Sequence, residues 1–288
     1  MSMAETLNIS NYPVQQPLAN DQKTLLVLIH GWGLNSAVWQ PFIESLPEIF
    51  LEKFTIVTID LPGFGINADK EIQPYSLANI CQYINNTITE PAVYLGWSLG
   101  GLVATEMALS YPEKVLSVVT VASSPHFLEE ENQGGEDNQT VWSGINPKVL
   151  NNFHKQLQID IKKTISGFLK IQAMGSPHIR QDIKKISELV FQHDMASKAT
   201  LDQSLKLLES SDYRMQLKAI TQPFFRLYGD ADSLVPKAVI ANINQLAPKS
   251  DFHIFQQASH APFISHGDDF KQILSNWLLA KKTKAFNW

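Results

Sequence analysis

The sequence predicts an α/β protein, with a mostly parallel, doubly wound sheet and an inserted helical cap. Three observations favour this fold class. Short aliphatic runs recur without polar alternation, which is typical of parallel strands covered by helices on both faces. Longer amphipathic stretches separate these runs, as expected where strands and helices alternate. One block of wholly helical pattern then separates the early aliphatic runs from the late ones.

The strands are expected where aliphatic runs stop at turn residues. The early runs are 25–29, 54–59, 92–95 and 115–122, and the late runs are 223–228 and 252–255. Helices are expected at 76–88 and 99–110, with a terminal helix from about Asp268. We therefore expect one sheet to which both ends of the chain contribute.

The helical block is expected to form the cap. We place the cap at residues 126–218 and the core at residues 1–125 and 219–288. Five residues within the cap share one helical face at three- and four-residue spacing: Ile161, Ile165, Phe168, Leu169 and Gln172. Residues 129–140 carry five acidic residues, two glycines and no large apolar residue, so we expect a solvated loop there.

Composition and charge limit the class of protein. The 288 residues are 44% hydrophobic, which suits a packed core and not a disordered chain. Lys and Arg number 23 against 28 Asp and Glu, and this net charge of −5 argues against nucleic-acid binding. The single cysteine, Cys81, excludes an internal disulfide and a multi-cysteine zinc site.

The first residues have neither the basic start nor the apolar core of a signal peptide. The longest aliphatic runs are too short to span a bilayer. We therefore expect a cytoplasmic globular protein, monomeric, with no nucleic-acid or membrane partner.

A G-x-S-x-G motif occupies residues 96–100, between a predicted strand and a predicted helix. In that context the chain turns sharply and exposes a strained serine, so we expect Ser98 to be a nucleophile. The alternative is a glycine-rich packing turn in which Ser98 only caps the helix.

A serine hydroxyl needs a base to remove its proton. The triad order in this architecture is nucleophile, acid, histidine. His260 follows the last predicted strand, where a loop points into the crevice at the carboxyl ends of the strands. We therefore favour His260 as the base over His266 and over His253, which lies inside the strand.

The acid is expected in the loop after the strand at 223–228. Asp232 lies deeper in this loop than Asp230, and we favour it as the partner of the histidine. Its role would be to hold the imidazole tautomer and stabilise the imidazolium. Helix capping is the alternative role for either aspartate.

Two backbone N–H groups are needed to stabilise a tetrahedral oxyanion. The amide of Leu99 follows the nucleophile, and the loop after the first predicted strand supplies Trp32. The alternative for the Trp32 side chain is a place in the core, which leaves the role of its backbone amide unchanged, and His30 is better explained as a structural hydrogen-bonding residue than as a second base. No metal-ligand spacing, P-loop or dinucleotide motif is found, so we expect no metal and no cofactor.

These motifs resemble the α/β-hydrolase superfamily over nearly the whole chain. Within it, the chain is similar to the family of biotin-synthesis carboxylesterases that demethylate pimeloyl-acyl-carrier-protein methyl ester. The matching stretches are HGWGLN at 30–35, DLPGFG at 60–65, LGWSLGGL at 95–102, TVASSP at 120–125, LYG at 227–229 with Asp232, and HAPFISH at 260–266. Serine at position 98 disfavours the dehalogenases and epoxide hydrolases, which attack with aspartate.

The resemblance implies roles for individual residues. Ser98, Asp232 and His260 would form the triad. Substrate contacts would come from Trp32, Ser98, Leu99, Phe168, Leu169, Lys170, Ile171, Gln172 and His260. The family binds its carrier protein through basic cap residues, whose positions are matched here by Lys163, Arg180 and Lys184. Gly167 stands where another basic residue is expected, and the segment 129–140 looks longer than the usual connection.

The distribution of charge agrees with an acidic protein-borne substrate. Residues 148–220 hold 12 basic and 7 acidic residues, a net charge of +5, and the remaining 11 basic and 21 acidic residues give −10. A basic cap on an acidic body would steer an acidic carrier protein. Lysines on solvated helices are also ordinary, and this alternative stays open.

The functional prediction is hydrolysis of the methyl ester of pimeloyl-acyl-carrier protein. One alternative is a broad carboxylesterase or C–C hydrolase of small molecules, with the same triad and a different pocket. A more remote alternative is a non-catalytic binding protein of the same fold.

Overall fold

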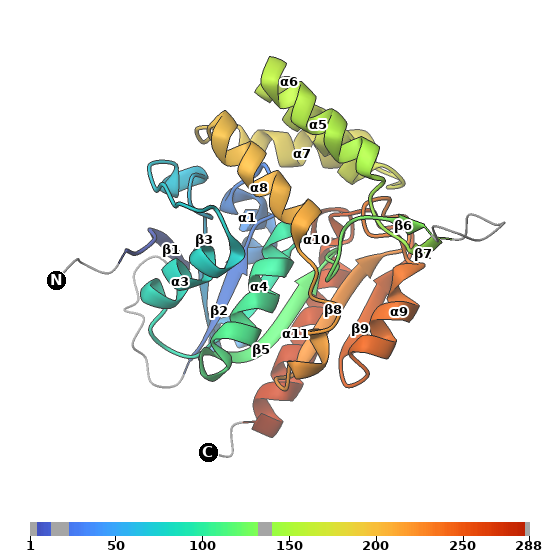
Figure 1. Cartoon of the computed structure of the whole chain (residues 1–288). Helices are drawn as coiled ribbons and strands as arrows, with labels where there is room; N and C mark the ends of the chain where they lie inside the picture. Colours follow the sequence, from blue (N-terminus) through green and yellow to red (C-terminus); the bar gives the residue numbers. More distant parts are fainter. Residues whose placement is uncertain (1–4, 13–22, 132–139, 286–288) are drawn as a thin grey trace.

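The computed structural model describes residues 5–12, 23–131 and 140–285, and its main feature is a seven-stranded sheet (Figure 1). The strand order is β1-β3-β2-β4-β5-β8-β9. Every neighbouring pair is parallel except β1 and β3, which are antiparallel at one edge. The strands are β1 (Ile9–Tyr12), β2 (Thr24–Ile29), β3 (Phe54–Ile59), β4 (Ala92–Trp97), β5 (Val115–Val121), β8 (Phe224–Gly229) and β9 (Asp251–Phe255).

Helices cover both faces of the sheet. Figure 1 shows α3 (Leu77–Thr87) and α4 (Leu99–Ser110) in front of the strands and α11 (Gly267–Ala285) behind them. Strands β2, β3, β4 and β8 are buried along their whole length, which explains why their sequences lack polar alternation. The remaining helices of the sheet layer are η1 (Ser36–Trp39), α1 (Gln40–Glu44), α2 (Glu48–Leu51), η2 (Gly65–Asn67), η3 (Pro112–Lys114), η4 (Leu217–Ala219), α9 (Val239–Leu246) and α10 (Pro262–Ser265).

Four α-helices of the described chain lie between β5 and β8: α5 (Pro147–Ile159), α6 (Ile161–Ala173), α7 (Ile179–Val190) and α8 (Lys198–Ser210). We call residues 147–210 the helical insertion. Its inner face carries the predicted apolar stripe, with Ile165, Phe168, Leu169 and Gln172 buried and Ile161 partly buried. The insertion packs over the loops that follow the sheet strands, with α7 against η1 and α10 (Figure 1).

The mostly parallel doubly wound sheet predicted from the sequence is confirmed, and the expected strands and helices lie within a few residues of their predicted ends. Several short elements were not predicted, among them the helices α1 and α2. The edge strand β1 was missed, and the ends of the segment 129–140 form the short antiparallel strands β6 (Glu130–Glu131) and β7 (Thr140–Trp142) instead of loop. Residues 132–139 lie outside the described part of the chain.

No helix in the described ranges is both long enough and apolar enough to cross a bilayer.

Candidate active site

Ser98 occupies the sharp turn between β4 and α4 in a strained backbone conformation, with φ 56° and ψ −116°. Two glycines make this turn possible. A Cβ on Gly96 would collide with the carbonyl of Gly100, and a Cβ on Gly100 would lie 2.5 Å from the carbonyl oxygen of Ile29. The backbone of Ser98 is held on both sides, since its N–H donates to Val121 O (2.9 Å) and its carbonyl accepts from the hydroxyl of Ser123, which follows β5 (2.8 Å).

Asp232 and His260 are in direct contact at the carboxyl ends of β8 and β9. His260 Nδ1 lies 2.8 Å from Asp232 Oδ2, and both side chains are buried. Asp232 Oδ1 accepts two further bonds, from the amides of Leu234 (2.8 Å) and Val235 (3.0 Å). Nε2 of His260 is buried and has no hydrogen-bond partner among the described residues. The structure therefore brings Asp232 and His260 together, but it shows no hydrogen bond between His260 Nε2 and Ser98 Oγ among the described residues, so that contact stays a prediction.

Trp97, the residue before Ser98, fixes the backbone of His260. Its indole Nε1 donates to His260 O at 2.7 Å, and the two rings lie 5.8 Å apart. The amide of His260 donates to Gln172 O in α6 at 3.1 Å. The histidine loop is thus tied both to the serine turn and to the helical insertion. No sequence signal pointed to Trp97, because only the tertiary structure brings its indole to this loop.

The competing candidates have other partners. Asp230 Oδ1 accepts from the amide of Gln257 at 2.6 Å and so shapes the loop. His253 lies within β9 with its ring against Phe255 (4.6 Å between centroids), and burial lowers its pKa. His266 Nδ1 lies 2.8 Å from Ser265 Oγ at the end of α10. None of the three contacts the Asp232–His260 pair in the interactions found among the described residues.

The loop after β2 lies against the serine turn. A Cβ on Gly31 would lie 3.3 Å from Ser98 Cβ. His30 supports this loop, since its Nε2 accepts from the amide of Leu61 (3.0 Å) and its Nδ1 lies 2.8 Å from Gly31 O. Burial lowers the pKa of His30, although nearby Asp60 opposes the shift. A neutral imidazole with Nδ1–H donating fits both bonds, which agrees with the predicted structural role.

Trp32 joins the same loop to the helical insertion. Its side chain is fully buried, its Nε1 donates to Leu201 O in α8 (3.0 Å), and its ring packs edge-on against Phe168 (4.8 Å). Phe153 in α5 completes this aromatic cluster, 5.4 Å from Phe168. The predicted oxyanion residue therefore also holds the insertion over the serine turn.

The predicted contacts in the insertion divide into buried and exposed residues. Phe168, Leu169 and Gln172 are buried, and both amide atoms of Gln172 lack hydrogen-bond partners among the described residues. Ile171 is partly buried and Lys170 is exposed, so Lys170 faces away from this interior. The predicted carrier-binding residues Lys163, Arg180 and Lys184 are all exposed, and Lys184 lies 3.7 Å from Glu188. No group of His, Cys, Asp or Glu in the described part could hold a metal ion.

The parallel sheet, the strained serine turn and the adjoining Asp–His pair define a hydrolase of the α/β-hydrolase class. The family model for the alpha/beta hydrolase fold matches residues 24–267. Curated relatives include the pimeloyl-[acyl-carrier protein] methyl ester esterases of Photobacterium profundum and Citrobacter koseri. The Photobacterium esterase is 45% identical, and the match covers 88% of this chain and 94% of the relative. The Citrobacter esterase is 41% identical, and the match covers 86% of this chain and 91% of the relative. The chain therefore belongs to the α/β-hydrolase family and, within it, to the family of these esterases.

Solved structures share the fold at much lower identity. An esterase from Exiguobacterium antarcticum superposes with a TM-score of 0.76 at 19% identity, and covers 94% of each chain. An enol-lactonase from Burkholderia xenovorans superposes with a TM-score of 0.74 at 15% identity, over 95% of this chain and 96% of the other. These likenesses show the fold alone.

Proposed function

We propose that this protein is a serine carboxylesterase that hydrolyses the methyl ester of pimeloyl-acyl-carrier protein and releases methanol. The observation that carries the proposal is the 41–45% identity to esterases of that name along nearly their whole length. The hydrogen-bonded Asp232–His260 pair beside the strained Ser98 turn supports an active enzyme rather than a binding protein.

In the proposed acylation step, Ser98 Oγ attacks the ester carbonyl while His260 Nε2 takes the hydroxyl proton. The amides of Leu99 and Trp32 stabilise the oxyanion, a contribution worth about 10²–10³ in turnover for each donor. His260 then passes its proton to the departing methoxide, and methanol leaves. Asp232 holds the imidazole so that Nε2 faces the reaction.

In the second step, His260 takes a proton from water, whose oxygen attacks the acyl-enzyme carbonyl. Collapse of the intermediate passes the proton from His260 to Ser98 Oγ and frees a terminal carboxylic acid, which then loses its proton to solvent and becomes a carboxylate. The aromatic cluster of Trp32, Phe168 and Phe153 borders this region, and burying a charge against such side chains is unfavourable. The product is therefore expected to leave and not to be bound again.

We further propose that the insertion expected at residues 126–218 acts as a cap through its helices α5–α8, and that the basic surface of these helices receives the carrier protein. Lys163, Arg180 and Lys184 are exposed and belong to the part of the chain with net charge +5. Such a field would raise the rate of encounter with an acidic partner, and salt would screen it.

The direct test is hydrolysis of the carrier-bound methyl ester by the protein and by Ser98→Ala. We expect the variant to lose roughly 10⁶-fold in kcat if serine and histidine act as a unit. Free dimethyl pimelate is the control substrate. Near-normal activity of the variant would refute the mechanism.

The salt dependence of the two substrates tests the carrier proposal separately. We expect kcat/KM for the carrier-bound ester to fall steeply with ionic strength, while kcat/KM for dimethyl pimelate stays nearly constant. Equal responses would favour a broad carboxylesterase acting on small molecules.

A further inference from the structure

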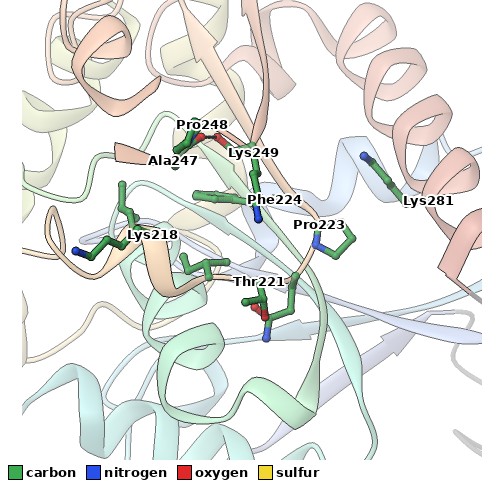
Figure 2. Close-up of a pocket in the computed structure, with 12 residues that line it drawn as sticks. Lys218, Thr221, Pro223, Phe224, Ala247, Pro248, Lys249 and Lys281 are labelled. Atoms are coloured by element: carbon green, nitrogen blue, oxygen red, sulfur yellow. Dashed lines mark hydrogen bonds between the residues drawn. The ribbon is translucent and has the colours of Figure 1, made fainter. Parts of the chain in front are cut away.

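A cavity lies at the other end of β8 from Asp232. It has a volume of about 470 Å³, within the range of small-molecule sites. One wall of the cavity is formed by the segment that leads into β8 and by the first residue of β8. The loop between α9 and β9 forms a second wall, and helix α11 forms a third (Figure 2). Its lining residues are Leu217, Lys218, Ile220, Thr221, Gln222, Pro223, Phe224, Ala247, Pro248, Lys249, Ser250 and Lys281.

The charged residues that line this cavity are all positive. Three lysines and no acidic residue line it. In Figure 2, Lys249 lies beside Phe224, with Lys218 on one side and Lys281 on the other. Lys281 Nζ contacts Asp251 Oδ2 outside the lining at 2.9 Å. Lys218 and Lys249 have no ion-pair partner in the described part of the chain, so their charges are available to a ligand.

The walls combine an apolar surface with one unpaired acceptor. Phe224 is nearly buried, and Pro223 and Pro248 lie beside it in the lining. Gln222 Nε2 donates to Pro112 O (3.0 Å), but its Oε1 is buried and has no hydrogen-bond partner among the described residues. A buried acceptor of this kind is costly unless a donor reaches it.

We propose that this cavity binds a small organic anion that has an apolar body and an N–H or O–H donor. Lys218 and Lys249 pair with the carboxylate or phosphate, and the wall around Phe224 covers the apolar body. Gln222 Oε1 accepts the hydrogen bond from the donor.

The site is independent of the proposed ester hydrolysis. The six residues of β8 span roughly 17 Å between the cavity and the loop that carries Asp232, at about 3.3 Å per residue. Ser98 and His260 lie at the same carboxyl edge of the sheet as Asp232. Changes at Lys218 and Lys249 are therefore expected to leave hydrolysis of dimethyl pimelate unchanged.

The test is isothermal titration calorimetry with N-octanoylglycine, which has a carboxylate, an amide N–H and an alkyl chain. Two related compounds separate these parts: N-octanoylglycinamide lacks the charge, and decanoate lacks the donor. We expect N-octanoylglycine to bind most tightly, and its binding to weaken at high salt. The double variant Lys218→Gln/Lys249→Gln should bind it about tenfold more weakly, since two charge-assisted contacts are lost.

Lys237→Gln is the matched control, because Lys237 is exposed beyond the opposite end of α9 from the cavity. It should bind N-octanoylglycine like the unaltered protein. The proposal is overturned if N-octanoylglycine shows no binding at about 5 mM. Equal affinity for the double variant, or equal binding of the neutral glycinamide, would also overturn it.

Discussion

At the scale of single residues, the two oxygens of Asp232 have different tasks. Oδ1 accepts from the amides of Leu234 and Val235, which shapes the loop, and Oδ2 accepts from His260. Asp230 makes a backbone contact only, to the amide of Gln257. The sequence already favoured Asp232 over Asp230 as the acid, and the contact with His260 supports that prediction.

Asp232→Asn should therefore keep the fold and lose the activity. The asparagine carbonyl can still accept from the two amides, but its NH₂ group would face His260 and favour the wrong tautomer. We expect kcat to fall by about 10⁴-fold, as this change does in a serine-protease triad. The measurement is ester hydrolysis, with circular dichroism as the check on folding. Asp230→Asn is the control, and a comparable loss of kcat there would contradict the assignment.

The motifs predicted which residues would gather at the candidate site, but not the contacts that fix their positions. The spacing and order of the G-x-S-x-G, Asp232 and His260 motifs follow the strand ends, so they can be read from the sequence. The indole of Trp97 on His260 O and the bond from the His260 amide to Gln172 O depend on tertiary packing. No local sequence pattern encodes such contacts, because their partners are 88 or more residues apart.

His30 should make the stability of the protein dependent on pH. Burial holds its pKa below the ordinary value of about 6.5. Below that value the unfolded chain takes up a proton that the folded protein does not. The free energy of unfolding should therefore fall as the pH drops below about 6.5, by up to about 1.4 kcal/mol per pH unit from this residue.

Urea unfolding of the protein and of His30→Gln at about pH 7.5 and about pH 5.5 tests this prediction. Glutamine keeps an acceptor for the Leu61 amide and does not titrate. We expect the variant to be less stable at both values but to lose less stability between them. Parallel losses in the two proteins would show that His30 does not carry the effect.

At the scale of elements, ionic and hydrogen-bond contacts of Arg214 join the two chain segments that enter and leave the helical insertion, and we call these contacts the clasp. Arg214 binds Glu130 through both of its terminal nitrogens (2.7 and 2.9 Å) and also binds Asp212 (2.6 Å). Its guanidinium lies 5.1 Å from the ring centroid of Trp142 in β7. The amide of Tyr213 donates to Pro125 O at 2.9 Å. Strands β6 and β7 thus belong to the base of the insertion.

Breaking this clasp should loosen the base of the insertion. Hydrogen bonds from Arg214 hold the pKa values of Glu130 and Asp212 below their usual ranges. The two carboxylates therefore contribute fully to the free energy of unfolding above about pH 4.5, and this contribution is lost as the pH falls below that value. For Arg214→Met at neutral pH, we expect amides in 126–131 and 211–214 to open more easily, by about 1–2 kcal/mol.

Hydrogen exchange measured by mass spectrometry reports this opening. Lys184→Gln is the control, because its exposed pair with Glu188 should contribute about 0.5 kcal/mol or less. Exchange at 126–131 should be the same in the control as in the unaltered protein. If Arg214→Met also left it unchanged, the clasp would have no role in holding the insertion.

Short elements were the ones that the sequence did not predict. Strands β2, β3, β4, β5 and β8 are buried or nearly so and have apolar runs, whereas β1 has four partly buried residues and a mixed pattern. Strand β6 consists of two glutamates, which composition alone assigns to loop. Both form through pairing with another segment, β1 with the distant β3 and β6 with the nearby β7. Pairing of this kind overrides weak local preference.

At the scale of the whole molecule, the net charge of −5 divides into +5 on residues 148–220 and −10 elsewhere. The positive part contains α6 and α7, which carry Lys163, Arg180 and Lys184 on exposed positions. His260 lies against this part, since its amide donates to Gln172 O in α6. An acidic partner attracted to the insertion would therefore arrive above the serine turn.

Gly167 offers a way to test this arrangement by adding charge. It lies in α6 one turn after Lys163, and a Cβ there would meet nothing within 4 Å. Gly167→Arg should fit without strain, with the gain in helix propensity of about 1 kcal/mol exceeding repulsion from Lys163 of about 0.5 kcal/mol or less. We expect kcat/KM for the carrier-bound ester to rise about threefold at low salt, and this gain to vanish at high salt.

Gly167→Ala separates charge from helix stability, because it improves the helix without adding a cation. It should leave kcat/KM for the carrier-bound ester unchanged, and neither variant should alter hydrolysis of dimethyl pimelate. A gain confined to Gly167→Arg, to the carrier-bound ester and to low salt can come only from attraction between the insertion and the carrier. If both variants behaved alike at low salt, the carrier would not dock on this face of α6, and the +5 charge would be ordinary solvated lysine.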